Sequence, residues 1–176
     1  MLVRNSIENV LPHKSYIGSR LICGSEESTP APGGEVTYTI DCTDIYNRYG
    51  ANTSLNTNDE KQGLLLYLDD NEKIMLNGVK NSNGYYSNIN VWNNNEIRLF
   101  KNSAYEIHPI QGNITHIIFE ASSKNYSGSA LSFETGSFTR PTDTTIDWTG
   151  STSSVVLNIG SGTQLRCIEM EITVQQ

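Results

Sequence analysis

The strongest periodicity in the chain lies near its C-terminus, in Leu165-Arg166-Cys167-Ile168-Glu169-Met170-Glu171-Ile172-Thr173-Val174-Gln175. Its apolar side chains recur at every second position as Ile168, Met170, Ile172 and Val174, with Glu169, Glu171, Thr173 and Gln175 between them. A period of two places successive side chains on opposite faces of a strand, so one face is predicted to lie in a core and the other in water. Cys167 is predicted to be a buried or half-buried thiol.

A second strand is predicted just before this one, over 154–159 (Ser-Val-Val-Leu-Asn-Ile). Between the two stretches lies Gly160-Ser161-Gly162-Thr163, and paired glycines favour a tight turn. Residues 154–174 are therefore predicted to form a hairpin.

Further upstream the chain is a series of short stretches rich in β-branched and aromatic residues. They are 97–107 broken at Asn102-Ser103, 113–121, 131–133 and 144–148, with Gly136, Pro141 and Gly150 at predicted bends. Strands that recur at roughly 8 to 12 residues are typical of a β-sandwich. The predicted fold class is thus all-β, an antiparallel, jelly-roll-like sandwich.

The stretch from 35 to 95 belongs to the same domain but is less regular. Residues 35–41 alternate apolar and polar side chains, and 63–68 (Gly-Leu-Leu-Leu-Tyr-Leu) is predicted to be a central strand covered on both faces. Asp69-Asp70-Asn71-Glu72 is predicted to be a turn. Residues 77–95 are rich in asparagine and are predicted to be a loop-rich region.

Three segments follow from this division: an N-terminal arm at 1–24, a linker at 25–34 and the sandwich at 35–176. The linker contains no apolar side chain larger than alanine or proline, so it is predicted to be extended. The arm is too apolar for a solvated tail and too short for a core of its own. It is therefore predicted to bind a partner through Leu2, Val3, Arg4, Ile7, Val10 and Leu11.

Charge and hydropathy exclude several classes of partner. The 176 residues carry a formal charge of −7, which disfavours nucleic acid because a phosphate backbone attracts basic surfaces. No apolar run approaches the roughly 18 residues that cross a bilayer, and Pro12-His13-Lys14 interrupts the region where a signal peptide would be apolar. Neither membrane insertion nor classical secretion is expected. Residues 1–20 are net positive, which suits an acidic partner, with a merely solvated end as the alternative.

The cysteine and histidine residues that could take part in catalysis or metal binding are scattered along the sequence rather than clustered. Cys23, Cys42 and Cys167 form no CxxC pair, and His13, His108 and His116 lie near no nucleophile motif. No enzymatic activity, metal or cofactor is therefore expected. The acidic run at 69–72 offers oxygens that calcium could use, but it lacks the spacing of an EF-hand loop, which favours a solvated turn.

Three aromatic residues in the asparagine-rich region are candidates for contact with a glycan or a neighbouring subunit: Tyr85, Tyr86 and Trp92. Exposed rings among amides supply contact area with hydrogen-bonding groups around it. The alternative is that these rings pack over one mouth of the sandwich.

The C-terminal half also resembles a known module. The residues that carry the likeness are 96–101 (Glu-Ile-Arg-Leu-Phe-Lys), 114–120 (Ile-Thr-His-Ile-Ile-Phe-Glu), Tyr126-Ser127-Gly128, Gly136-Ser137, 147–151 (Asp-Trp-Thr-Gly-Ser), 153–157 and 167–172. This block is similar to a jelly-roll-like repeat module found in secreted and surface proteins of gut Bacteroidetes and in virion proteins of the tailed phages that infect them. Glu169 and Glu171 stand where the family more often has Lys and Thr.

The resemblance implies a noncatalytic sandwich used for attachment or display. An apolar, slightly basic arm before a Pro/Gly linker is similar to the layout of a capsid appendage, such as a head fibre of a crAss-like phage. The expected function is therefore that of a virion structural protein, with its arm bound to the shell and its sandwich projecting, as a homo-oligomer in which a trimer is favoured. The alternative is a carbohydrate-binding module of a bacterial surface system.

Overall fold

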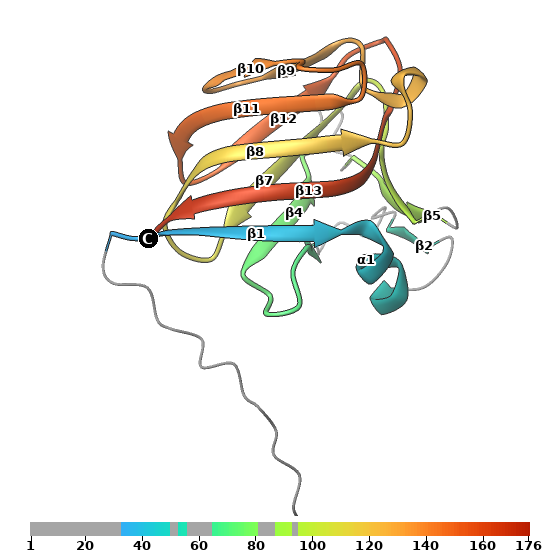
Figure 1. Cartoon of the computed structure of the whole chain (residues 1–176). Helices are drawn as coiled ribbons and strands as arrows, with labels where there is room; N and C mark the ends of the chain where they lie inside the picture. Colours follow the sequence, from blue (N-terminus) through green and yellow to red (C-terminus); the bar gives the residue numbers. More distant parts are fainter. Residues whose placement is uncertain (1–32, 50–52, 56–64, 81–86, 93–94) are drawn as a thin grey trace, which may run out of the picture.

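The structure is a computed structural model, and it describes residues 33–49, 53–55, 65–80, 87–92 and 95–176. Two antiparallel sheets face each other across one core, which confirms the predicted all-β sandwich (Figure 1). The predicted arm, nearly all of the predicted linker and the pair Tyr85 and Tyr86 lie outside the described residues.

The larger sheet has eight strands among the described residues. Along the path β10-β11-β8-β13-β6-β5-β2 these are β10 (Ser137–Thr139), β11 (Thr145–Thr152), β8 (Asn113–Ala121), β13 (Leu165–Gln175), β6 (Glu96–Leu99), β5 (Ile89–Trp92) and β2 (Thr53–Leu55); β1 (Glu35–Asp41) also pairs with β13. The smaller sheet has the order β3-β4-β7-β12-β9, with β3 (Leu65–Tyr67), β4 (Ile74–Gly78), β7 (Ser103–Pro109), β12 (Val155–Ile159) and β9 (Leu131–Phe133). From β6 to β9 each successive strand lies in the opposite sheet, which agrees with the expected jelly-roll-like connectivity.

The core lies between the inner faces of the two sheets. Its largest fully buried side chains are Trp148, Tyr105 and Phe119. The Trp148 indole donates a 2.8 Å hydrogen bond to the carbonyl of Thr135, and a Cβ added at Gly150 would lie 2.6 Å from the indole ring. Gly150 therefore lies within β11 against this ring, and the bend predicted at this position is a register shift between Thr149 and Thr152.

The decisive C-terminal stretch is a strand, but its alternation changes phase. Cys167 is buried as predicted and Met170, Ile172 and Val174 face the core, whereas Ile168 is exposed. A register shift in the pairing of β13 with β8 between Cys167 and Glu169 adds the extra residue. The inward position predicted for Ile168 is therefore wrong, because a bulge changes which face a residue occupies.

The hairpin predicted at 154–174 is also wrong. Its two strands exist, but β12 pairs with β7 and β9 in the smaller sheet while β13 pairs with β1, β6 and β8 in the larger one. The Gly160–Thr163 segment instead crosses between the sheets and is held by neighbours in the 128–130 turn, where Gly160 donates its N–H to the Ala130 carbonyl at 2.9 Å. An apolar strand followed by a glycine-rich turn is compatible with either connection.

One prediction for the irregular half needs correction. The strand within 63–68 is β3, at the edge of the smaller sheet among the described strands rather than at its centre, although Leu66 and Leu68 are buried. Within the loop-rich region 77–95, the described residues include β5, which ends at Trp92.

A short helix that the sequence analysis does not predict follows β1 directly. Helix α1 (Cys42–Tyr49) buries Cys42 and Ile45, and a single 3-10 turn, η1 (Lys124–Tyr126), follows β8. The aromatic and β-branched residues of α1 lower its intrinsic helix propensity, so burial of one face stabilises it instead.

Both ends of the described chain lie at the same end of the sandwich (Figure 1). Glu35 pairs with Gln175, and the N–H of Gln176 donates to the carbonyl of Gly34 at 3.1 Å. Helix α1 and β5 lie at the opposite end (Figure 1).

Candidate functional site: a groove at the edge of β1

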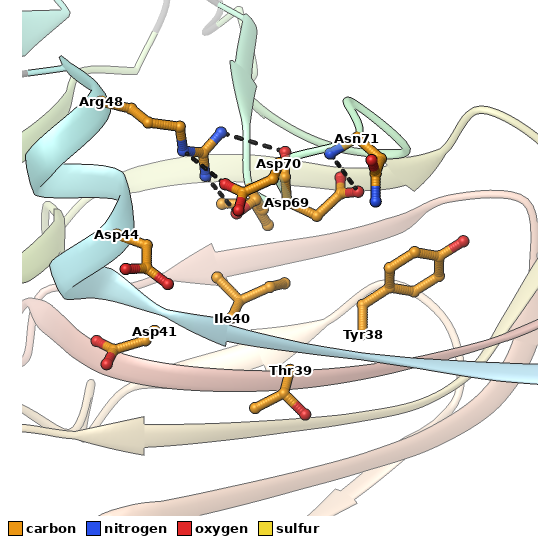
Figure 2. Close-up of a pocket in the computed structure, with 10 residues that line it drawn as sticks. Tyr38, Thr39, Ile40, Asp41, Asp44, Arg48, Asp69, Asp70 and Asn71 are labelled. Carbon is orange, nitrogen blue, oxygen red and sulfur yellow. Dashed lines mark hydrogen bonds and ion pairs between the residues drawn. The ribbon is translucent and has the colours of Figure 1, made fainter. Parts of the chain in front are cut away.

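A polar hollow beside the edge of β1 lies between β1, α1 and the turn that joins β3 to β4 (Figure 2). It encloses about 220 Å³. Its lining consists of Tyr38, Thr39, Ile40, Asp41, Asp44, Arg48, Leu68, Asp69, Asp70 and Asn71. The groove thus has an apolar floor from three side chains and a rim of carboxylates.

The alternating side chains of β1 supply part of the groove's apolar floor. Ile40 is buried and Tyr38 packs partly against the core, and both point toward the β3–β4 turn, whereas Thr39 points away from it (Figure 2). This inward and outward pattern follows the predicted alternation over 35–41.

The acidic rim begins where β1 becomes α1. Asp41 accepts a 2.7 Å hydrogen bond from the backbone N–H of Thr43, and Asp44 lies in the first turn of the helix. Hydrogen bonding from Thr43 lowers the pKa of the Asp41 carboxyl below its usual value, because it favours the charged form. Both positions suit an anion, since the N-terminus of a helix carries partial positive charge.

Arg48 joins α1 to the β3–β4 turn. Its guanidinium donates to three backbone carbonyls, at 2.8 Å to Leu68, 3.2 Å to Tyr67 and 3.1 Å to Asp69. It also forms a 3.3 Å ion pair with Asp70, whose side chain is 77 % exposed. Arg48 therefore holds the groove's wall. No ion pair joins the rim carboxylates Asp41 and Asp44 to a cation among the described residues.

The carboxylate of Asp69 stabilises the predicted turn at 69–72. One carboxylate oxygen accepts from the N–H groups of Lys73 and Ile74, each at 2.7 Å, and the other accepts from Asn71 at 3.2 Å. Glu72 adopts a φ of 58°, in the left-handed region. The prediction of a turn at 69–72 is confirmed, and no group of three His, Cys, Asp or Glu side chains placed to hold a metal occurs among the described residues.

The backbone of β1 offers unpaired hydrogen-bonding groups to the groove. In an antiparallel pair, alternate residues direct both their N–H and C=O groups to the partner strand. The bond from Gln176 to Gly34 places Gly34 among the bonded residues, so Val36, Tyr38 and Ile40 follow in the same set. Thr37 and Thr39 therefore direct their backbone groups away from β13, toward an edge where no described strand pairs.

The histidines and cysteines of the described region are engaged within the fold. Nε2 of His116 lies 2.8 Å from Oδ1 of Asp147, and Nε2 of His108 lies 3.0 Å from the Asn77 amide. Burial raises the pKa of the Cys167 thiol, which donates to the Glu169 carbonyl at 2.9 Å. A buried neutral thiol is a poor nucleophile.

Most of the candidate residues from the sequence are not among those that the structure describes. Leu2, Val3, Arg4, Ile7, Val10 and Leu11 lie outside the described residues, as do Tyr85 and Tyr86. Trp92 ends β5 and pairs in register with Glu96. Strand β5 lies at the end of the sandwich away from the C-terminus (Figure 1). One sequence signal points to the groove: Asp41, followed by Thr43 and Asp44, is a typical helix start.

Comparisons of the chain with protein-family models, with curated proteins and with solved structures found no match. Within the part of the chain that the structure describes, no helix has the length and apolar character needed to span a bilayer.

Proposed function

We propose that this chain is a noncatalytic structural protein of a phage virion, a head fibre or decoration protein whose N-terminal arm binds the shell while the sandwich projects. Its location would be the virion, and its partner a capsid or other virion protein. The proposal extends the resemblance of residues 96–176 to a display module.

The observation that carries the proposal is the position of the chain ends. Gly34 and Gln176 are hydrogen-bonded at one end of the sandwich, so the arm that precedes Gly33 departs from that end. A module tethered at one end leaves the opposite end, with α1 and β5, free to contact other molecules (Figure 1).

The polar side chains of the body support a scaffold role. Arg48 holds three carbonyls of the β3–β4 strand and turn, and Arg140 donates to the carbonyls of Ser127 and Gly128 at 2.9 and 2.6 Å. Burial lowers the pKa of Arg140 from its usual high value. Charged groups that tie loops to the sheets stabilise a rigid body that can project from a surface.

A homo-oligomer with cyclic symmetry, with a trimer favoured, belongs to the same proposal because fibres and knobs are assembled in this way. Trp92, with Tyr85 and Tyr86, remains the proposed contact with a subunit or a glycan.

Mass spectrometry of purified virions, from a phage whose genome encodes the chain, tests this function. We expect the chain among the virion proteins at a constant ratio to the shell protein. Absence from intact virions, together with retention on a glycan array that depends on Trp92, would replace the proposal with the carbohydrate-binding module.

A further inference from the structure

The bulge in β13 brings two buried cysteines together where β1 ends. Ile40 lies opposite Met170 in the pairing of β1 with β13, and both side chains are buried. The next buried position after Ile40 is Cys42, which begins α1 directly after β1. The next buried position on β13 is Cys167, because the bulge leaves Ile168 exposed. The two cysteines therefore occupy neighbouring inward positions on the two adjacent segments.

The two thiols interact within the core. Both side chains are fully buried and belong to the same apolar cluster. Burial, and then hydrogen bonding with the Cys42 thiol, raise the pKa of Cys167. Residues that face each other across antiparallel strands have Cα atoms about 4.5 to 5.5 Å apart, and a disulfide spans Cα separations of about 4.4 to 6.8 Å. A covalent bond between the two sulfurs therefore suits the spacing of the strands.

We propose that Cys42 and Cys167 form a disulfide, which joins the start of α1 to β13, when the protein meets a small-molecule disulfide such as glutathione disulfide. One protein thiolate attacks a sulfur of the small disulfide, breaks its S–S bond and releases one small thiol. The second protein thiolate attacks the resulting mixed disulfide and releases the other small thiol. The two protein sulfurs are oxidised, the small disulfide is reduced to two thiols, and these products receive the two protons of the protein thiols.

Helix α1 gives the buried thiols a route to the oxidant. Attack requires a thiolate, so a buried neutral thiol must first reach water. The helix has only eight residues, and isolated helices shorter than about 12 to 15 residues are marginal in water. Local opening of α1, at the end of the sandwich, can expose Cys42 (Figure 1). We therefore expect slow oxidation of the folded chain and faster oxidation during refolding.

The bond would stabilise the sandwich by linking positions far apart in the sequence. A disulfide that closes a long loop restricts the unfolded chain more than one that closes a short loop. Disulfides persist in oxidising surroundings and are rare in a reducing cytoplasm. The inference does not rest on the virion, but under the proposed function it means that the body assembles with free thiols and gains stability after release from the cell.

Peptide mapping tests the bond directly. The full chain is purified with its thiols reduced and is then incubated folded, or refolded from denaturant, in buffers with increasing ratios of glutathione disulfide to glutathione. Remaining thiols are alkylated before digestion. We expect the protein to lose two hydrogen atoms and to yield a peptide pair joined through Cys42 and Cys167. Alkylation of both cysteines throughout the series in the refolded chain overturns the inference, as does a disulfide that uses Cys23 in place of either.

Thermal unfolding of the oxidised and reduced forms measures the contribution of the bond. We expect oxidation to raise the melting temperature of the wild type by at least about 5 °C, given the typical effect of a disulfide in a domain of this size. The matched control Cys23→Ala should retain this rise, whereas Cys42→Ala and Cys167→Ala should lose it. If either core variant fails to fold, the wild-type peptide map and melting temperatures still decide.

An oxidised wild-type chain that melts no higher than the reduced chain also overturns the inference. Failure of the disulfide leaves the proposed virion role intact, because that role is tested by the composition of the particles. Absence from the particles, in turn, leaves the disulfide intact.

Discussion

The hydroxyl of Tyr105 donates a 2.7 Å hydrogen bond to the backbone carbonyl of Asn88, and this bond joins the two sheets across the core. The same oxygen accepts a 2.7 Å bond from the N–H of Phe100. Tyr105 belongs to β7 of the smaller sheet, whereas Asn88 precedes β5 and Phe100 follows β6 of the larger one. One phenol therefore satisfies two backbone groups from the opposite sheet.

Replacing Tyr105 with phenylalanine keeps the ring and leaves both backbone groups without this partner. We expect the free energy of unfolding to fall by about 1 to 3 kcal/mol, the cost of unsatisfied buried groups. Denaturant titration measures the change. An unchanged stability would mean that neither bond contributes.

Tyr105 also makes the free energy of unfolding depend on pH. Burial raises the pKa of Tyr105 to about 12, whereas a tyrosine in the unfolded chain titrates near 10. From about pH 10 the unfolded state releases this proton and the folded state retains it, so stability is lost as pH rises toward 12. We expect the wild type to lose on the order of 2 to 3 kcal/mol more than Tyr105→Phe between these pH values. Parallel pH curves for the two chains would contradict the assignment.

Substitutions at Arg48 and at Asp70 distinguish the stability contributed by the carbonyl contacts of Arg48 from that contributed by its surface ion pair. Arg48→Ala removes the donors to three carbonyls and should destabilise the fold by about 1 to 2 kcal/mol. Asp70→Asn is the matched control, because the exposed pair at 3.3 Å should contribute less than about 1 kcal/mol. Thermal unfolding of both variants measures the two losses of stability. Equal losses would show that the ion pair, not the carbonyl contacts, holds the turn.

Chelation tests the calcium alternative at 69–72. The Asp69 carboxylate accepts three backbone N–H groups, so it already stabilises the turn without a metal. We expect the melting temperature to remain unchanged when EDTA is added, and calcium to leave it unchanged as well. A fall of many degrees with EDTA would instead assign a calcium site to this turn.

Local patterns predicted single strands better than their pairing. The bounds of β1 and β8 match the predicted 35–41 and 113–121, because alternation and β-branched composition act within a strand. The bulge at Ile168 and the separation of β12 from β13 were missed. Both depend on contacts with strands distant in the sequence, which no local pattern contains.

The groove could not be predicted from the sequence, for the same reason. It requires the edge of β1, the unpredicted helix α1 and the β3–β4 turn to meet, and Arg48 joins them across about twenty positions of sequence. The acidic run was correctly predicted to be a turn, since Asp and Asn favour turns through bonds to their own backbone. Its place in the groove's wall was not.

Trp92→Ala tests the proposed distal contact. Truncation of a central aromatic anchor typically costs about 2 kcal/mol or more of binding free energy, so oligomerisation or glycan retention should weaken while the fold persists. Circular dichroism checks the fold, and ultracentrifugation and a glycan array check binding. If the domain unfolds and its contacts are otherwise unchanged, the ring belongs to the core.

Deletion of residues 1–24, followed by measurement of incorporation into particles, tests attachment through the arm. The sandwich at 35–176 should remain folded, because the described core draws its buried residues from Ile40 onward. We predict a circular dichroism spectrum like that of the full chain, and particles assembled with the deleted form that contain none of it. A deleted chain that joins the particles in the wild-type amount would contradict attachment through the arm.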